Sequence, residues 1–125
     1  MATVELTKEN FDATISGNDI VIIDFWAPWC GPCKQYGPIF EKVSDEYPDI
    51  VFGKVNTEEQ QELGGYFQVQ SIPTTVILRE GIGIFSQPGL LPEEALHDIL
   101  KQVKELDMEM VKKEIEKQQS QGDNA

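Results

Sequence analysis

The chain has 125 residues, and 22 acidic against 10 basic side chains give it a formal net charge of −12 at pH 7. A chain of this length can bury the core of one domain without help from several disulfides or metals. Its acidity argues against binding to a phosphate backbone, which needs clustered Lys and Arg. No apolar run approaches the roughly 18 residues that cross a bilayer, so we expect a soluble protein that binds neither nucleic acid nor membrane.

The N-terminus has no basic region followed by an apolar stretch, which is the pattern of a secretory signal. We therefore expect the protein to work in the reducing cytoplasm. Residues 1–100 carry 16 acidic and 5 basic side chains, whereas residues 101–125 carry 6 and 5. The last segment is thus chemically distinct from the rest.

The first half of the chain alternates between strand and helix patterns. The sequence predicts a short strand at 3–6, a helix capped by Thr7, a buried strand at 20–27 and an amphipathic helix at 33–47. Asp24 is the anomaly in the buried strand, because an ionised side chain is costly among apolar neighbours. Pro38 lies inside the amphipathic helix and should kink it.

The second half begins in the same way and ends with a hairpin. The patterns predict a strand at 50–56, a capping box at 57–60 that opens a helix, strands on both sides of Glu80-Gly81, and a helix that starts at Pro92. Alternation followed by a hairpin is typical of an α/β fold whose mixed sheet is covered by helices.

The only two cysteines, Cys30 and Cys33, lie between the buried strand and the amphipathic helix. At this spacing both sulfurs fall in the first helical turn, at a separation that permits a disulfide. The free N–H groups and the macrodipole at the helix start favour a thiolate and lower the pKa of the first cysteine. Cys30 is therefore the candidate nucleophile and Cys33 its resolving partner.

Two other interpretations of this pair stay open. A stapling disulfide between residues three apart closes a very small loop and would constrain little of the unfolded chain. A zinc site needs four ligands as a rule, and the chain offers only His97 besides the two thiols, unless a second copy completes the site. We expect no metal, and His97 is most simply a surface residue of the last predicted helix.

The stretch FWAPWCGPCK at 25–34 resembles the active-site signature of the thioredoxin family. The resemblance continues in VIIDFWA before it, in IPT at 72–74 and in Gly89, and covers about residues 3–105. It implies a thioredoxin fold with a central mixed sheet of about five strands and about four flanking helices. We expect this domain at 1–105, followed by a helical extension and a flexible tail at 106–125.

The resemblance also implies a site. It makes Cys30 and Cys33 the redox pair, gives Asp24 the proton transfer for Cys33, and gives Lys54 a tuning role beside Asp24. Burial in an apolar strand should raise the pKa of Asp24; the alternative is a carboxylate that is hydrogen-bonded to backbone and merely tolerated. It further implies a substrate-binding surface around a cis-proline, formed by Trp29, Gly31, Pro32, Ile72, Pro73 and Gly89.

The implied activity is that of a protein-disulfide reductase that acts by thiol–disulfide exchange. Gly31-Pro32 adds no positive charge beside the thiolate, so the reduced pair should remain a good reductant. No dinucleotide-binding motif is present, so no cofactor is bound and electrons come from a separate reductase, NADPH-dependent by resemblance or linked to ferredoxin. The alternatives are a thioredoxin-fold oxidase or isomerase, and a binding subunit that uses the C-terminal helix.

Some residues depart from the family pattern. Pro88 and Leu90 flank the matching glycine and change the rim of the groove, which should alter partner choice without loss of disulfide chemistry. Gly37 is a poor residue inside a helix.

Residues 104–120 are helix-compatible with a weak apolar stripe, so they form either a frayed extension of the last helix or an element that packs on the domain or a partner. We expect a monomer, with weak association through this helix as the alternative.

Overall fold

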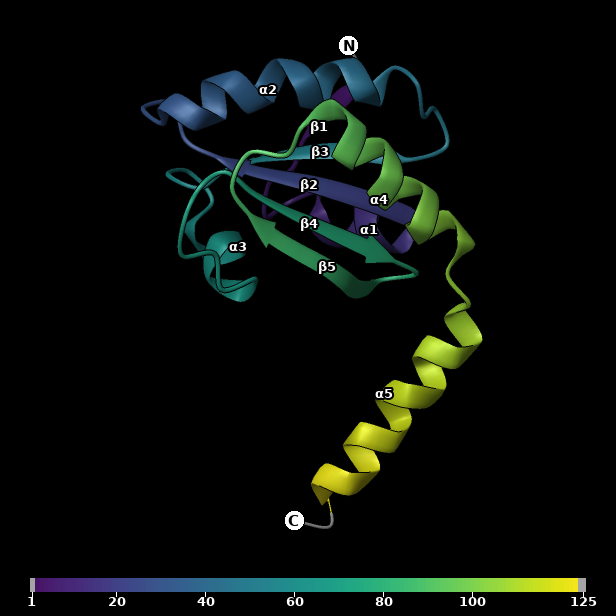
Figure 1. The fold of residues 1–125 in the computed structure, drawn as a ribbon. Coiled ribbons are helices and arrows are strands. Elements are labelled where there is room, and N and C mark those ends of the chain that lie inside the picture. Colours follow the sequence, from purple (N-terminus) through teal and green to yellow (C-terminus); the bar gives the residue numbers. More distant parts are fainter. Residues whose placement is uncertain (1, 124–125) are drawn as a thin grey trace.

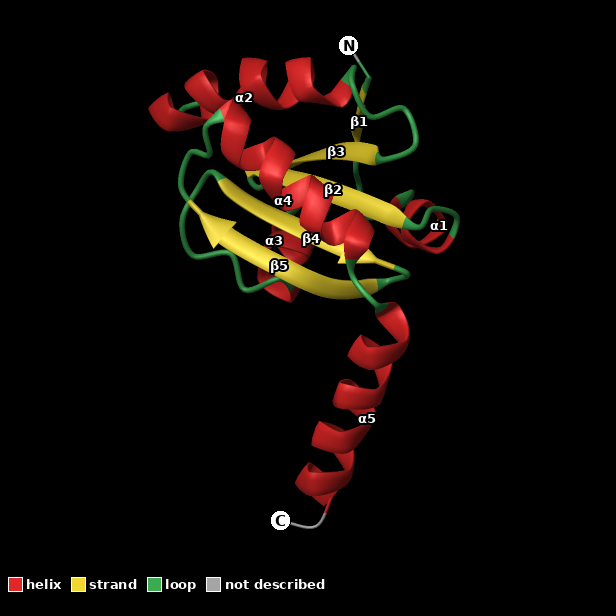
Figure 2. Cartoon of the chain, turned by 45° about the vertical axis from the view of Figure 1, so that its right-hand side comes forward, coloured by secondary structure: helices red, strands yellow, loops and turns green. Residues whose placement is uncertain are grey.

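A five-stranded sheet runs through the middle of the molecule, and helices cover both of its faces (Figure 1, Figure 2). The computed structural model describes residues 2–123. The strands are β1 (Thr3–Glu5), β2 (Ile20–Trp26), β3 (Val51–Asn56), β4 (Thr74–Arg79) and β5 (Ile82–Pro88). The helices are α1 (Phe11–Ser16), α2 (Gly31–Ser44), α3 (Gln61–Tyr66), α4 (Glu93–Glu105) and α5 (Met108–Asp123).

The strand order β1-β3-β2-β4-β5 places β2 at the centre of the sheet. This strand runs parallel to β3 and antiparallel to β4, so the sheet is mixed, and the predicted thioredoxin-like architecture is confirmed. The hairpin between β4 and β5 turns at Glu80 and Gly81, both of which have positive φ, of 53° and 78°. Such a two-residue turn matches the twist of antiparallel strands.

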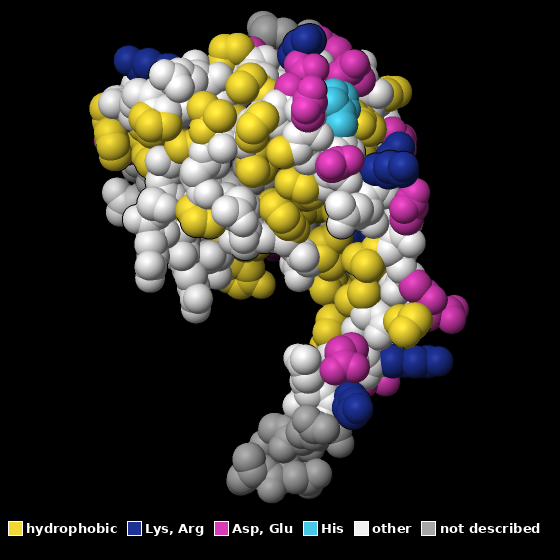
Figure 3. All heavy atoms as spheres, in the orientation of Figure 1, with side chains coloured by type: hydrophobic (Ala, Val, Ile, Leu, Met, Phe, Trp, Pro, Cys, Tyr) yellow, Lys and Arg dark blue, Asp and Glu magenta, His cyan; other side chains and the backbone are white. Residues whose placement is uncertain are grey.

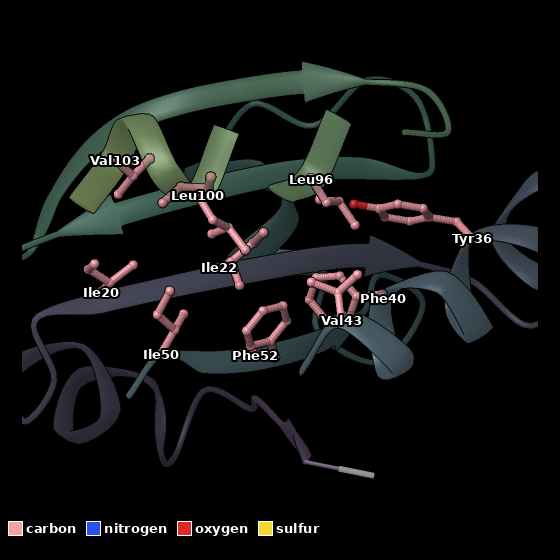
Figure 4. Close-up of a cluster of buried hydrophobic side chains, with 11 residues drawn as sticks. Ile20, Ile22, Tyr36, Phe40, Val43, Ile50, Phe52, Leu96, Leu100 and Val103 are labelled. Carbon is pink, nitrogen blue, oxygen red and sulfur yellow. The ribbon is translucent and has the colours of Figure 1, made fainter. Parts of the chain in front are cut away.

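Successive side chains of β2 enter two separate cores, because neighbouring residues of a strand point to opposite faces. Helices α2 and α4 cover one core, and helices α1 and α3 lie behind the other (Figure 1, Figure 2). Figure 4 shows the α2–α4 core, in which aromatic side chains of α2 and β3 meet leucines of α4. This arrangement holds α2 firmly across the sheet and thereby fixes the position of its first turn.

Two predicted helix starts are wrong. Helix α1 begins at Phe11, since Thr7 forms a preceding turn in which its N–H donates to Asn10 Oδ1 at 2.8 Å. Helix α3 begins at Gln61, because the Thr57 hydroxyl donates to the Trp26 carbonyl oxygen at 3.1 Å and does not cap a helix. In both places a polar side chain that suits a cap makes another hydrogen bond.

The C-terminal segment forms a separate helix. The chain leaves the helical conformation at Leu106, and the Asp107 carboxylate then accepts the N–H groups of Glu109 at 3.0 Å and Met110 at 3.3 Å. Helix α5 points away from the sheet (Figure 1), and Lys112 pairs with Glu80 of the hairpin turn at 2.7 Å. Of the extension and tail predicted at 106–125, residues 108–123 are helical, and the last two residues lie outside the described residues.

Candidate active site

The two cysteines meet where the central strand passes into helix α2. Cys30 is the N-cap of the helix, and its sulfur accepts the backbone N–H of Cys33 at 3.2 Å. Cys30 and Cys33 form a disulfide, with their Cα atoms 5.2 Å apart. The Cys30 sulfur is thus held at the positive end of the helix, where a thiolate is favoured.

A cis peptide bond joins Ile72 to Pro73, in agreement with the prediction for this loop. The Ile72 carbonyl oxygen lies 3.7 Å from the Cys30 sulfur. The Gly89 N–H donates to the Pro73 carbonyl oxygen at 2.8 Å, and Gly89 has a φ of 97°, which favours glycine. The loop before β4 and the end of β5 are thereby fixed to each other beside the disulfide.

Exposed side chains surround the disulfide on the side of the α2 start. Trp29 is 66% exposed, and its indole N–H donates to the Glu58 carboxylate. Gly31 and Pro32 are also exposed, and a Cβ on Gly31 would meet no heavy atom within 4 Å. Figure 3 shows that acidic side chains gather at the other end of this face, away from the start of α2. The surface beside the disulfide is therefore open, and the acidic side chains seen on this face lie away from it.

Asp24 is completely buried in β2, and neither carboxyl oxygen has a hydrogen-bond partner among the described residues. The interpretation of Asp24 as a carboxylate bonded to backbone is therefore wrong. Burial raises the pKa of Asp24 from 3.8 to about 7, while the charge of Lys54 lowers this pKa and that of Glu41 raises it. A carboxyl group with such a pKa exchanges a proton near neutral pH.

Lys54 and Glu41 link Asp24 to the surface. Strand register places Lys54 of β3 directly beside Asp24, and the Lys54 ammonium lies 3.8 Å from Glu41 and 5.2 Å from the centre of the Trp26 ring. Among the residues that line a pocket of about 240 Å³ are Lys54, Glu41, Trp26 and Cys33. Water and protons can therefore approach the buried sulfur from this side.

Sequence reasoning missed Glu41 and Glu58. Glu41 lies eight residues after Cys33, and therefore on nearly the same face of α2, so helical spacing could have found it. Glu58 lies in the turn after β3, and no local pattern connects it with Trp29. His97 is a half-buried residue of α4, and Tyr47 Oη is 2.8 Å from its Nδ1 and Glu46 is 3.3 Å from its Nε2.

Within residues 2–123, no group of three or more His, Cys, Asp or Glu side chains is arranged to hold a metal ion. The same part of the chain contains no helix that is long and apolar enough to cross a membrane.

Residues 2–102 match the family model described as Thioredoxin. The chain belongs to the thioredoxin family. A Streptomyces coelicolor protein named as a thioredoxin 2 is 57% identical over 120 residues, which cover 96% of this chain and 90% of the relative. The Bacillus subtilis thioredoxin is 40% identical over 101 residues, with 80% of this chain and 96% of the relative covered.

A mutant thioredoxin from Halobacterium salinarum has the same fold, with a TM-score of 0.78 and 31% identity. The match covers 84% of this chain and 93% of that one. Membership makes this protein a thiol–disulfide oxidoreductase of the protein-disulfide reductase type, as predicted. Thioredoxins carry no prosthetic cofactor and use a reductase and disulfide-containing substrates. The resemblance and the fold predicted from it are confirmed.

Proposed function

We propose that Cys30 and Cys33 divide the reduction of a substrate disulfide between them. In the reduced protein the Cys30 thiolate attacks one substrate sulfur, a mixed disulfide forms, and the other substrate sulfur leaves as a thiolate. Cys33, once deprotonated, attacks the Cys30 sulfur and releases the second substrate sulfur as a thiolate. Two electrons pass to the substrate, and the protein keeps the Cys30–Cys33 disulfide.

The order of the two cysteines follows from their places in the helix. Cys30 is the N-cap, and its sulfur accepts the N–H of Cys33 at 3.2 Å. A hydrogen bond to the charged form and the positive helix end both stabilise a Cys30 thiolate. Cys33 lies one turn further into the helix and acts only after Cys30 has bound the substrate.

Asp24 is the base that removes the proton of Cys33. Its pKa of about 7 keeps a large fraction of the carboxyl groups ionised at neutral pH, and the same groups return the proton readily. Lys54 stabilises the ionised form, whereas Glu41 opposes it. These two side chains thus adjust the pH range in which Cys33 is activated.

The surface around the cis-proline binds an extended segment of the substrate. Its members are Trp29, Gly31, Pro32, Ile72, Pro73 and Gly89. Ile72 and the residues near it offer backbone groups that can pair with an extended chain, as in strand addition. Pro88 has no N–H to donate at this rim and Leu90 is 37% exposed, so both act on the choice of protein substrate and leave the disulfide chemistry unchanged.

The proposed function also includes an electron donor, a cellular compartment and an oligomeric state. The electron donor is a thioredoxin reductase that depends on NADPH, or one linked to ferredoxin. The protein works in the cytoplasm as a monomer. Residues 1–105 carry the activity, and residues 106–125 form an extension that the reaction does not need.

The N-cap position of Cys30, together with a completely buried Asp24 whose carboxyl oxygens have no hydrogen-bond partner among the described residues, carries this mechanism. Reduction of insulin by dithiothreitol tests it, because a catalyst accelerates the turbidity that follows. The full chain should accelerate the reaction, Cys30→Ser should abolish the acceleration, and Cys33→Ser should accumulate a mixed disulfide with the substrate. A full chain that gives no acceleration while still binding a protein partner would support the binding-subunit alternative.

A further inference from the structure

A pocket of about 290 Å³ lies beside the reacting cysteine, between the cis-proline loop and helix α3. Trp29 and Ile72 both line it. Trp29 directly precedes Cys30, and the Ile72 carbonyl oxygen lies 3.7 Å from the Cys30 sulfur. Strands β2 and β3 are parallel, so the segments that lead to α2 and α3 leave the sheet at the same edge (Figure 1). The pocket is therefore within reach of a substrate segment whose disulfide is attacked by Cys30.

Hydrogen bonds hold the walls of this pocket in place. The Trp29 indole N–H donates to the Glu58 carboxylate, which keeps the exposed ring on one side. The Thr57 hydroxyl donates to the Trp26 carbonyl oxygen at 3.1 Å, and the Thr57 methyl group is the part nearest to α3. Within the described part of the chain, no charged side chain lines the pocket. It thus offers a ring and apolar surface to a ligand, and no partner for a charge.

Helix α3 contributes two adjacent glycines, Gly64 and Gly65, to the lining. Glycine is among the least favourable residues in a helix, and neither of these two has the positive φ that would require it. A Cβ on Gly64 would meet the Thr57 methyl group at 4.0 Å, and a Cβ on Gly65 would meet no heavy atom within 4 Å. Larger residues would therefore fit at both positions and suit the helix better, but they would partly fill the pocket.

The chemistry of the pocket favours an aromatic side chain. Pockets for drug-sized molecules begin at roughly 300 Å³, so this one has room for a single large side chain. Transfer of an apolar side chain out of water is favourable, and an aromatic ring gains further from contact with the ring of Trp29. A charged side chain would lose its hydration without gaining an opposite charge.

We propose that this pocket is a specificity subsite, in which Gly64 and Gly65 leave room for an aromatic side chain of the substrate two residues from the attacked cysteine. Alternate side chains of an extended segment point to the same side. A residue two positions from the attacked cysteine therefore faces the protein together with that cysteine. The subsite rests on the proposed attack by Cys30 and on the binding of an extended segment at the cis-proline, and it makes disulfides with a nearby aromatic residue the preferred substrates.

The test follows the oxidation of the reduced full chain by disulfide-linked dimers of short peptides. The halves of each dimer are identical, so attack on either sulfur gives two peptide thiols and the Cys30–Cys33 disulfide. One series has Phe, Ala or Lys two residues before the cysteine, and a second series has them two residues after it. In at least one series the Phe dimer should react roughly tenfold faster than the Ala dimer. The Lys dimer should be no faster than the Ala dimer at about 0.5 M salt, which screens the net charge of the protein.

Two variants fill the pocket from α3. Gly65→Leu should lower the ratio of the Phe rate to the Ala rate from about ten to below about two, and Gly64→Ala, which adds one methyl group, should lower it by a smaller factor. Both should unfold at the same urea concentration as the unmodified chain or a higher one, because each replaces glycine with a better helix former. Tyr66→Leu is the matched control and should keep the full ratio, since Tyr66 follows Gly65 in the same helix but is exposed and is not among the residues that line the pocket.

Equal rates for the Phe and Ala dimers in both series would overturn the proposal, and so would a ratio that Gly65→Leu leaves unchanged. Either result would leave the proposed function intact, because the disulfides would still be reduced. A reduced chain that reacts with none of the dimers would instead refute the attack by Cys30. The comparison of Phe with Ala uses the unmodified chain, so the test stays decisive even if Gly65→Leu folds poorly.

Discussion

The two faces of the sheet share the same strands but bury different kinds of side chain. Toward α1 and α3, strand β2 contributes Val21, Ile23 and Phe25 to an apolar core. Toward α2 and α4, it contributes Ile20 and Ile22 and then Asp24, which is fully buried and has no hydrogen-bond partner among the described residues. One face thus contributes only stability, whereas the other gives up stability to place a titrating group behind the cysteines.

The active site lies on the face of the sheet that holds Asp24. Helix α2 packs on the face that holds Asp24, and its first turn carries both cysteines. The polar residues Lys54 and Thr75 stand beside Asp24 on the same face, because directly paired residues of neighbouring strands point the same way. Substitutions on the face toward α1 and α3 should therefore change stability more than activity. Substitutions at the active site, on the face toward α2, should change activity more strongly.

The largest effect on activity is expected for Cys30→Ser. Loss of the attacking sulfur should abolish the acceleration of insulin reduction and leave only the rate of dithiothreitol alone, because no mixed disulfide can form. Ile23→Val on the other face is the matched control and should keep the full rate. Residual catalysis by the serine variant above the uncatalysed rate would contradict the role of Cys30.

Asp24→Asn should change the pH dependence of stability. The folded protein holds a proton on Asp24 up to a pKa of about 7, whereas the unfolded chain releases it near 3.8. The stability of the unmodified chain therefore falls as pH rises from about 4 to 7, by up to about 4 kcal/mol. The Asn side chain carries no such proton, so the variant should be more stable by a similar amount at pH 9 and by little at pH 3.

Urea unfolding of both chains across this pH range measures the difference. Ile20→Val, in the same strand and on the same face, is the control and should follow the unmodified chain at every pH. A constant difference between Asp24→Asn and the unmodified chain from pH 4 to 9 would show that Asp24 has an ordinary pKa.

Ile23→Ala on the apolar face should destabilise the protein without affecting the reaction. It removes a completely buried side chain, so the free energy of unfolding should fall by about 2–4 kcal/mol. The rate of insulin reduction per folded molecule should stay the same. A slower folded enzyme would mean that the two cores are not independent.

The smallest effect on activity is expected for a chain that ends at Lys104. Removal of α5 takes away the exposed Lys112–Glu80 ion pair, the Leu106 carbonyl oxygen that accepts from Arg79 at 2.8 Å, and the buried Met108 side chain. The free energy of unfolding should fall by about 1–3 kcal/mol, mostly through the loss of Met108. Sedimentation should show monomers of both chains with equal activity; dimers of the full chain alone would make α5 an association element.

Short-range patterns predicted most of the strands and helices and the cysteine pair, whereas the resemblance to the thioredoxin family supplied the rest of the site. Residues close together in sequence determine the N-cap position of Cys30, the apolar run around Asp24 and the turn at Glu80 and Gly81. The starts of α1 and α3 were missed, because Thr7 and Thr57 suit a helix cap but are engaged by other bonds. In the sequence, Tyr36 fits one more apolar position of an amphipathic helix. Its hydrogen bond with Thr75 could not be predicted, because Thr75 lies 39 residues further along the chain.

The reduction potential of the Cys30–Cys33 pair tests the central claim most directly. Equilibration with glutathione redox buffers, followed by separation of the oxidised and reduced forms, gives this potential. A reductase of this family should have a value of about −270 mV, which is typical of thioredoxin. A value near about −180 or −120 mV, typical of disulfide isomerases and oxidases, would contradict the assignment as a reductase.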